Sequence, residues 1–530
     1  MRYNRGMPSL AESAATLDDR TAALVAENGT LRKEIASLQH QLEWFKKQIF
    51  GQKSERRLID ADGRQLSLGE LDGEAGTPPP EKALQVPAHT RRQSTKPATG
   101  DDESTLFFDE SRIPIEVITV VDPKVAGLDP GGYEVIDEKV SYRLAQRPGS
   151  YVVLKYVRPV VKVKQSQALM CPPAPQGVIE GSRADVSFLA GLIVEKFAYH
   201  LPLYRQHQRL LDAGIRVSRP WLTQLTHSAL SLLRPIYEAQ LESIRTSHVV
   251  AIDETPIKAG TTGTGKMKAA YFWPMYGDQS EVCFPFFPGR DHKYVTRALG
   301  TTRPEGSVLL SDGYDAYSAY AKKLELTHAQ CWAHTRRAFF DAQKVEPESA
   351  AHALDLIGAI YEVEAQIREK GLTGPPKASY RQQHAGPKVK DFFNWVEKQF
   401  AAQGFLPSSP LTEALAYARE RRAGLQVFLD DAEVAVDTNH LERALRAIPM
   451  GRKAWMFCWT EVGAEYVGIA QSLITTCRLH GIDPYTYLVD VLQRIGLHPA
   501  SRVAELTPRQ WKPLFAESPL RSDLIPHTAP

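Results

Sequence analysis

Apolar residues recur at heptad spacing between residues 17 and 50, which predicts one long amphipathic helix. One seam consists of Leu17, Leu24, Leu31, Leu38 and Phe45, and the other of Thr21, Asn28, Ile35, Leu42 and Ile49. Sustained heptads favour a coiled coil that joins copies of the chain into a homo-oligomer. A helix that packs on its own domain is the alternative. The basic residues at the end of this helix, up to residue 57, fit contact with DNA phosphates and exposure to solvent equally well.

Residues 58–112 show no periodicity and contain a run of three prolines at 78–80, so we expect a flexible linker. Residues 113–175 differ, because three runs at 115–121, 133–144 and 151–164 are rich in β-branched and aromatic residues. They predict a small β module with a hairpin turn at 147–149.

Residues 176–245 have a helical pattern, with a short helix over 203–211, a turn at Gly214 and a longer helix after Ser218. Ser218 is suited to cap that helix, and Pro220 to its first turn. The pattern fits a helix-turn-helix that binds a DNA major groove, and a plain helical hairpin fits as well. The residues available for DNA contact are Arg205, Arg209, Arg216 and Arg219. His200 and His207 fit surface or core positions better than metal binding.

In residues 246–334, four apolar residues at 249–252 run into Asp253, which indicates a buried strand ending in a carboxylate. Two more strands, a helix, a strand ending in Asp312, a helix and a strand follow. This is the element order of an RNase H-like fold, and it would place Asp253 beside Asp312. A buried carboxylate needs a basic side chain or a metal ion as partner. An aspartate in a purely structural ion pair is therefore the alternative reading.

Residues 335–430 are amphipathic and predict a helical insertion before the last part of the core, residues 431–500. That last part opens with a helix capped by Asp437 or Thr438, with Glu442 in its second turn. Taken alone, Glu442 would be a surface residue. Basic residues gather near it, namely Arg443, Arg446, Arg452 and Lys453, and Trp455 and Trp459 follow for base stacking or core packing. Residues 501–530 form a C-terminal extension.

Composition narrows the class of protein further. Of 530 residues, 43% are apolar and 24% charged, as in an ordinary soluble protein of several domains. The net charge is only +2, so any nucleic-acid-binding charge must be local. The five cysteines form no Cys-x-x-Cys pair, which argues against a zinc ribbon or disulfide scaffold and favours a reducing cytosol. No run is long and apolar enough to cross a membrane, and the first residues lack a signal core.

Several motifs together resemble the insertion sequence 66 family of bacterial DDE transposases. They are Asp253-Glu-Thr, Ser311-Asp-Gly-Tyr-Asp-Ala-Tyr317, Cys331-Trp-Ala-His-Thr-Arg-Arg-Ala-Phe339, Asn439-His-Leu-Glu-Arg-Ala-Leu-Arg446, Gly451-Arg-Lys453, Ser472-Leu-Ile-Thr-Thr-Cys-Arg-Leu-His-Gly-Ile-Asp-Pro-Tyr485 and Ile49-Phe-Gly-Gln-Lys-Ser-Glu55. Each motif is weak alone, but their order along nearly the whole chain is specific.

The resemblance implies an α/β protein with an RNase H-like core and a catalytic triad of Asp253, Asp312 and Glu442. These acids would hold two Mg²⁺ or Mn²⁺ ions, with Asp253 bridging them. A metal-bound water would free a 3′-OH at the element end, which then attacks target DNA. Family members usually carry a zinc module with paired cysteines. Here the β module keeps only Cys171, so zinc is not expected.

Cys331 and His334 either support this site or hold a metal, and we favour the structural role. The expected partners are DNA, at the element ends and at the target, and accessory transposition proteins, in the bacterial cytoplasm at the nucleoid. Arg443, Arg446 and the 452–453 pair are candidate phosphate contacts. Two other readings remain open: a non-catalytic DNA-binding regulator derived from a transposase, and a hydrolytic nuclease that does not join strands.

Overall fold

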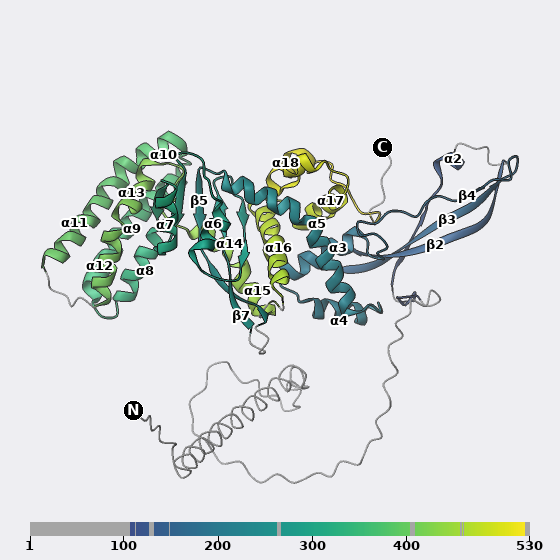
Figure 1. The fold of residues 1–530 in the computed structure, drawn as a ribbon, viewed down its shortest axis with the longest axis horizontal. Coiled ribbons are helices and arrows are strands. Elements are labelled where there is room, and N and C mark those ends of the chain that lie inside the picture. The colour runs from purple at the N-terminus through teal and green to yellow at the C-terminus, as the bar shows by residue number, and fades with distance from the viewer. Residues whose placement is uncertain are drawn as a thin grey trace, which may run out of the picture. The chain divides into compact units, whose positions relative to one another are not determined.

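The computed structural model describes residues 106–524, apart from 112, 127–131, 148, 262–266, 403–408, 456, 457 and 459. Helices and sheets are mixed along this part of the chain (Figure 1). The predicted coiled-coil helix and nearly all of the linker lie outside the described residues. The end of the predicted linker is packed, because Phe108 is buried and forms a β-bridge with Ile215. The packed part of the chain therefore includes residues before the expected boundary at residue 113.

The β module is one sheet of order β1-β3-β2, with β4 paired to β3. Its elements are β1 (Ile115–Thr119), α2 (Pro123–Ala126), β2 (Tyr133–Arg147), β3 (Ser150–Val163) and β4 (Leu169–Met170). The hairpin falls where the sequence predicts it, because Arg147 pairs with Ser150 and Gly149 has a φ of +85°, which glycine adopts without strain.

Three helices follow: α3 (Val186–Phe197), α4 (Leu203–Asp212) and α5 (Arg219–Arg245). The predicted cap is present, because the Ser218 hydroxyl accepts from the amide of Trp221 at 3.3 Å. The predicted apolar face of α5 is buried at Leu222, Leu225 and Ala229. α5 therefore packs on the core for much of its length.

The central sheet has the strand order β12-β11-β5-β8-β9. The strands are β5 (Val249–Ile252), β8 (Met275–Gly277), β9 (Val282–Cys283), β11 (Val308–Ser311) and β12 (Thr327–Gln330), with α6 (His292–Leu299) and α7 (Asp315–Lys323) between the later ones. β5, β8 and β9 pair antiparallel, whereas β5, β11 and β12 are parallel. Within this sheet the elements follow the predicted order, but the chain before α6 also forms a separate sheet that the sequence did not predict.

The sequence predicts continuous strands over 268–276 and 281–287, and each of them is broken by a proline. The break between β7 (Met267–Phe272) and β8 contains Pro274, and the break between β9 and β10 (Phe286–Phe287) contains Pro285. Proline has no N–H to donate to the ladder, so pairing stops there. β7 and β10 join β6 (Thr255–Thr261) in a separate sheet of order β10-β7-β6. Asp253 lies at the corresponding break between β5 and β6.

The predicted insertion is helical and begins directly after β12. Its elements are α8 (Trp332–Ala342), α9 (Pro347–Glu369), α10 (Gly374–Tyr380), the π-helix η1 (Arg381–Ala385), α11 (Gly386–Ala402), α12 (Pro410–Glu420) and α13 (Arg422–Asp430). We call them the helical subdomain. They pack on one another, and α13 also contacts β12, so the subdomain adjoins the parallel end of the sheet (Figure 1).

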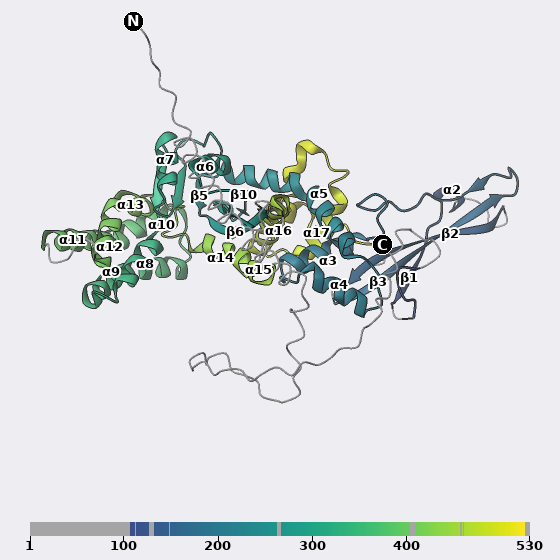
Figure 2. The same cartoon turned by 60° about the horizontal axis from the view of Figure 1, so that its bottom comes forward.

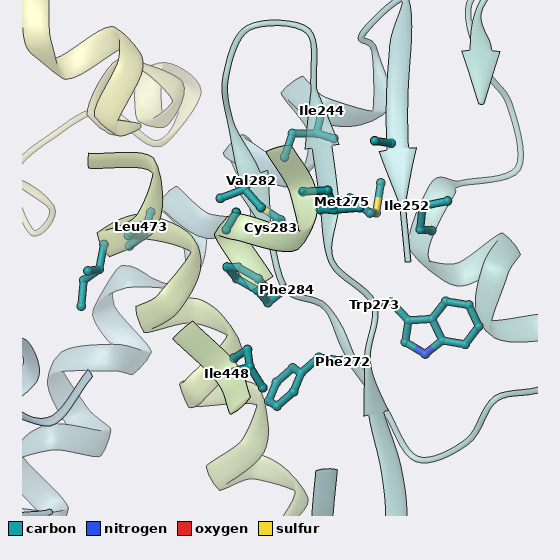
Figure 3. Packing of buried hydrophobic residues seen from close by; sticks show 14 of the residues in the cluster. Ile244, Ile252, Phe272, Trp273, Met275, Val282, Cys283, Phe284, Ile448 and Leu473 are labelled. Atoms are coloured by element: carbon teal, nitrogen blue, oxygen red, sulfur yellow. The ribbon is translucent and has the colours of Figure 1, made fainter. Parts of the chain in front are cut away.

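The last helices return to the antiparallel end of the sheet. They are α14 (Asn439–Leu445), α15 (Ala447–Trp455), α16 (Glu461–Leu479), α17 (Pro484–Arg494), the 3₁₀ helix η2 (Ala500–Leu506) and α18 (Pro508–Phe515). α16 packs so closely on the strands that a Cβ at Gly468 would come within 2.4 Å of the Phe284 carbonyl oxygen. Figure 3 shows Phe272, Phe284 and Ile448 in the shared apolar cluster.

The end of the C-terminal extension docks on the β module. Ser522 donates to the Asp185 carboxylate at 2.5 Å, and Tyr156 donates to Asp523 at 2.7 Å. Leu524 is buried in a small second core with Val152 and other residues of the module. The first and last described parts of the chain are therefore in contact.

Candidate active site

Asp253 follows the buried strand β5. Its amide donates to the Pro274 carbonyl at 3.2 Å, and its Oδ1 accepts from the amide of Glu254 at 2.8 Å. Burial raises the pKa of the Asp253 carboxyl to about 7, and the nearby charges of Glu254 and Asp312 act in the same direction. Asp253 is thus a half-buried acid whose ionised form a nearby positive charge would favour.

Asp312 follows β11, the parallel neighbour of β5. Leu310 pairs with Ala251, so both strands end at the same edge of the sheet and deliver Asp312 beside Asp253. Asp312 Oδ1 accepts from the amide of Tyr314 at 3.0 Å, which fixes the direction of the carboxylate. The structure therefore brings together the first two acids of the predicted triad.

A hydrogen-bonded cluster joins the two strand ends. The Glu254 carboxylate, with 4% of its side chain exposed, accepts from Tyr317 Oη and from Arg290 Nε, the latter at 2.6 Å. The Arg290 guanidinium lies 4.4 Å over the Tyr314 ring, and Tyr314 Oη donates to the Arg290 carbonyl at 2.7 Å. We call Glu254, Arg290, Tyr314 and Tyr317 the strand-end cluster. It holds the residues whose amides orient Asp253 and Asp312.

The third parallel strand, β12, ends at Cys331. Cys331 Sγ lies 3.2 Å from Thr438 Oγ1 and accepts from the Thr438 amide at 3.3 Å, so it connects β12 to the start of α14. A hydrogen bond with Cys331, together with the charges of Asp312 and Asp253, raises the pKa of His334 to about 9. These contacts support a structural role for Cys331.

The sequence predicts Glu442, the third acid, in the second turn of its helix. In the structure it lies in the first turn of α14. α14 begins beside Cys331, at the edge that carries the two aspartates, and Glu442 is half-buried. However, the described residues contain no group of three or more His, Cys, Asp or Glu side chains that could hold a metal ion. The structure does not gather Glu442 into one cluster with Asp253 and Asp312.

The positively charged side chain of Arg421, in the helical subdomain, contacts the residue that follows Asp312. The sequence did not indicate this contact. Arg421 Nη2 donates to the Gly313 carbonyl at 3.1 Å, and its guanidinium stacks 3.8 Å over the Tyr417 ring. A Cβ at Gly313 would lie 2.5 Å from the Arg421 guanidinium, so only glycine leaves room for this contact. The loop that carries Asp312 is thus held by the subdomain.

The predicted DNA-contact residues fall into two groups. Exposed side chains are Arg205, Arg216, Arg219, Arg443, Arg446 and Lys453. Two others have structural partners: Arg209 pairs with Glu195 and donates to Tyr151 Oη at 2.9 Å, and Arg452 donates to the Pro256 carbonyl. His207 bonds the Val217 carbonyl at 2.7 Å, as expected for a structural histidine.

Comparison with protein families identifies the class. Residues 181–466 match the family described as "Transposase IS66 family", and 472–509 match "IS66 C-terminal element". The chain belongs to the IS66 family of transposases. Residues 37–102, outside the described part, match "Transposase C of IS166 homeodomain". Three similar proteins are the uncharacterized proteins y4hP, y4jD and y4qI of Sinorhizobium fredii. Each is 28% identical to this chain, over 90%, 91% and 95% of its length and 89%, 96% and 96% of theirs.

The family motifs of this IS66 chain meet at the edge of the sheet. Tyr314 and Tyr317 of the Ser-Asp-Gly-Tyr-Asp-Ala-Tyr motif bind Arg290 and Glu254, and Glu254 belongs to the Asp-Glu-Thr motif. In the sequence these residues carry the resemblance to the family but have no predicted role. Their spacing gave no signal of contact, because Tyr317 and Glu254 are 63 residues apart.

Among the described helices, none is long and apolar enough to cross a membrane.

Proposed function

We propose that this IS66 family chain is a DDE transposase that cuts the ends of its element and joins the freed 3′-OH to target DNA. Family membership supports the class, and the adjacent positions of Asp253 and Asp312 at two parallel strand ends support the chemistry. The central sheet has three antiparallel strands, β9, β8 and β5, and two further strands, β11 and β12, that run parallel to β5. This arrangement supports an RNase H-like core.

The two aspartates fit a hard divalent cation, because Mg²⁺ and Mn²⁺ prefer carboxylate oxygens. The raised pKa of Asp253 supports this fit, since a cation supplies the positive charge that the ionised carboxyl lacks. When bound, such ions activate the attacking oxygen and neutralise charge on the leaving oxygen. Asp253 and Asp312 would hold them. Glu442 is the candidate third ligand, and its fit is incomplete because it joins no three-group cluster in the part described.

The surrounding residues hold these acids in place. The strand-end cluster fixes the backbone that orients both aspartates, and Arg421 holds the carbonyl that follows Asp312. A hydrogen bond with Cys331 and the charges of Asp312 and Asp253 raise the pKa of His334 to about 9, so the site favours the charged imidazolium while no cation is bound. This positive charge partly balances the negative charge of the carboxylates. The site therefore repels the negatively charged DNA backbone less than two isolated carboxylates would.

The decisive experiment is Mg²⁺-dependent cleavage and joining of DNA that carries the ends of the element encoding this chain. Asp253→Asn should abolish cleavage and leave DNA binding intact, because it removes a charge and no basic residue. Asp315→Asn, at an exposed position three residues after Asp312, is the matched control and should cleave normally. Full cleavage by Asp253→Asn would refute the assignment. Cleavage by the unaltered chain without strand joining would identify a hydrolytic nuclease instead.

One observation favours a second candidate, a DNA-binding regulator that does not cut. Glu442 does not join the two aspartates in a metal-holding group among the described residues. A regulator would bind the element ends with unchanged affinity in Mg²⁺ and in EDTA and would give no cut or joined product. A transposase would give both products in Mg²⁺ and neither in EDTA.

A further inference from the structure

Two hollows of the surface meet on α14. One lies between α14 and the helical subdomain, and its lining includes Tyr361, Arg368 and Lys377. The other lies between α14, α15, α16 and the segment after α3, and its lining includes Arg446 and Arg478. His440 and Arg443 line both hollows, so the two hollows adjoin each other, and we call the pair the α14 groove.

The α14 groove is rich in cations that have no carboxylate partner. Its basic residues, apart from the buried Arg381, are Arg368, Lys377, Arg443, Arg446 and Arg478. Within the part of the chain described, no carboxylate lies at ion-pair distance from any of these five; all but Lys377 are exposed. Arg478 contacts protein through a hydrogen bond to the Ala198 carbonyl at 3.2 Å.

The acids of the groove offset only a small part of this charge, because Asp437 is the single lining carboxylate besides the paired Glu364. Glu364 is bound by the guanidinium of Arg381 at 2.7 and 2.9 Å, so that pair is neutral. Asp437 is 8% exposed and accepts two hydrogen bonds from Asn439. The hollow beyond Arg443 contains no acidic lining residue. A chain with a net charge of only +2 thus concentrates unpaired cations here.

The position of the groove connects it to the candidate active site. Tyr276 lines it, and Tyr276 pairs with Ala251, two residues before Asp253. In Figure 1 and Figure 2, α14 lies between α9 of the helical subdomain and α3. A linear polyanion in the groove would therefore pass from the subdomain, beside the start of the Glu442 helix, toward the segment between α3 and α4.

We propose that the α14 groove binds the phosphodiester backbone of DNA, with Arg443, Arg446 and Arg478 as its main contacts. The inference rests on the proposed function and extends it by naming the path of the substrate. The sequence suggested phosphate contacts for Arg443 and Arg446, but gave no reason to add Arg478 or the subdomain residues Arg368 and Lys377. Exposed guanidinium groups without carboxylate partners suit this ligand, because each phosphate contact releases counterions.

The test is the salt dependence of DNA binding by the full-length chain, measured by fluorescence anisotropy. The probes are a short duplex of arbitrary sequence and a single strand of the same length, in EDTA so that nothing is cut. Each phosphate contact contributes about −0.9 to the slope of log K against log salt for duplex and about −0.7 for single strands. Arg443→Gln/Arg446→Gln should reduce the slope by about two contacts, and Arg478→Gln by about one.

Arg521→Gln, at an exposed position on the C-terminal extension, is the control and should leave the slope unchanged. A change with only one probe would support the groove and identify which form of DNA lies in it. Unchanged slopes for both groove variants, with circular dichroism like that of the unaltered chain, would overturn the inference. Cleavage of element ends by the unaltered chain would still support the proposed function in that case, so the two failures are distinguishable.

Discussion

Arg421 occupies the space that a side chain on residue 313 would need. Its guanidinium donates to the Gly313 carbonyl at 3.1 Å, and a Cβ there would lie 2.5 Å from it. Gly313 follows Asp312, so a residue of the helical subdomain holds the loop of a candidate catalytic acid. The insertion is therefore part of the site's support and not only an addition to the fold.

Removing this contact should reduce DNA cleavage and metal affinity more than it reduces the stability of the fold. We expect Arg421→Gln to reduce DNA cleavage roughly 10- to 100-fold, the range seen when residues supporting metal ligands are lost. Gly313→Ala should act in the same direction, because its methyl group displaces the guanidinium. Arg422→Gln is the control, since Arg422 stacks on Phe393 of the subdomain. Direct measurement of Mn²⁺ affinity for the three variants checks this. Equal affinity in all three would contradict it.

The strand-end cluster predicts an order of stabilities for two tyrosines. Tyr317 is fully buried and donates to the Glu254 carboxylate, whereas Tyr314 donates to a neutral carbonyl. A bond to a charged group contributes about 1.5–3 kcal/mol, and a neutral one about 0.5–1.5 kcal/mol. Tyr317→Phe should therefore lower the free energy of unfolding more than Tyr314→Phe, as measured by urea titration. The reverse order would mean that Arg290 alone satisfies Glu254.

Arg381 forms a buried ion pair within the helical subdomain and also bonds the segment before α14. Arg381, with 1% exposure, binds both oxygens of Glu364 and donates to the carbonyls of Phe428 and Val434 at 2.9 and 2.8 Å. Arg381→Met should cost about 3–5 kcal/mol of unfolding free energy, because it leaves Glu364 buried and unpaired.

The double variant Arg381→Met/Glu364→Leu separates the two contributions of this arginine. It should recover the part due to the unpaired carboxylate but not the part due to the four backbone carbonyls around Arg381, which still lose their donor. Urea titration of both variants measures the difference. A double variant as stable as the unaltered chain would show that the carbonyl bonds contribute nothing.

His328 predicts a pH dependence of stability. Burial lowers the pKa of His328 to about 4, with Arg421 acting in the same direction, while an unfolded histidine titrates near 6.5. Between pH 6.5 and 4 the unfolded chain binds a proton that the folded chain does not, so stability falls as the pH falls through this range. The contribution reaches about 3 kcal/mol at its lower end.

His328→Gln should flatten this part of the curve, because glutamine keeps hydrogen-bonding capacity and does not titrate. Urea midpoints measured at intervals between pH 7 and pH 4 check it. If the variant and the unaltered chain lose stability in parallel, other groups cause the acid sensitivity.

The sequence predicted the central strands and their order because apolar runs and their terminal aspartates are local features. It also predicted the hairpin and the helix cap at Ser218, which depend on neighbouring residues. Local patterns did not reveal the breaks at Pro274 and Pro285, although each proline could have indicated its break through the missing N–H.

Contacts between distant segments were beyond the same reasoning. A helical pattern assigns an arginine to solvent, yet Arg381 is buried because Glu364 and four carbonyls surround its guanidinium. Likewise, the residues next to Gly313 in the sequence do not indicate its contact with Arg421, which is 108 residues away. The two aspartates were predicted as neighbours because parallel strands bring their ends together, whereas the position of Glu442 depends on how α14 packs.

The docking of Leu524 on Val152 and Tyr156 affects how the protein is made. A ribosome completes the β module early, but Leu524, which covers this apolar patch, is synthesised long after it. A copy shortened by a premature stop codon would expose these side chains to water. Such a product should be prone to aggregation and proteolysis, because the chain would lack the side chain that keeps this patch out of water.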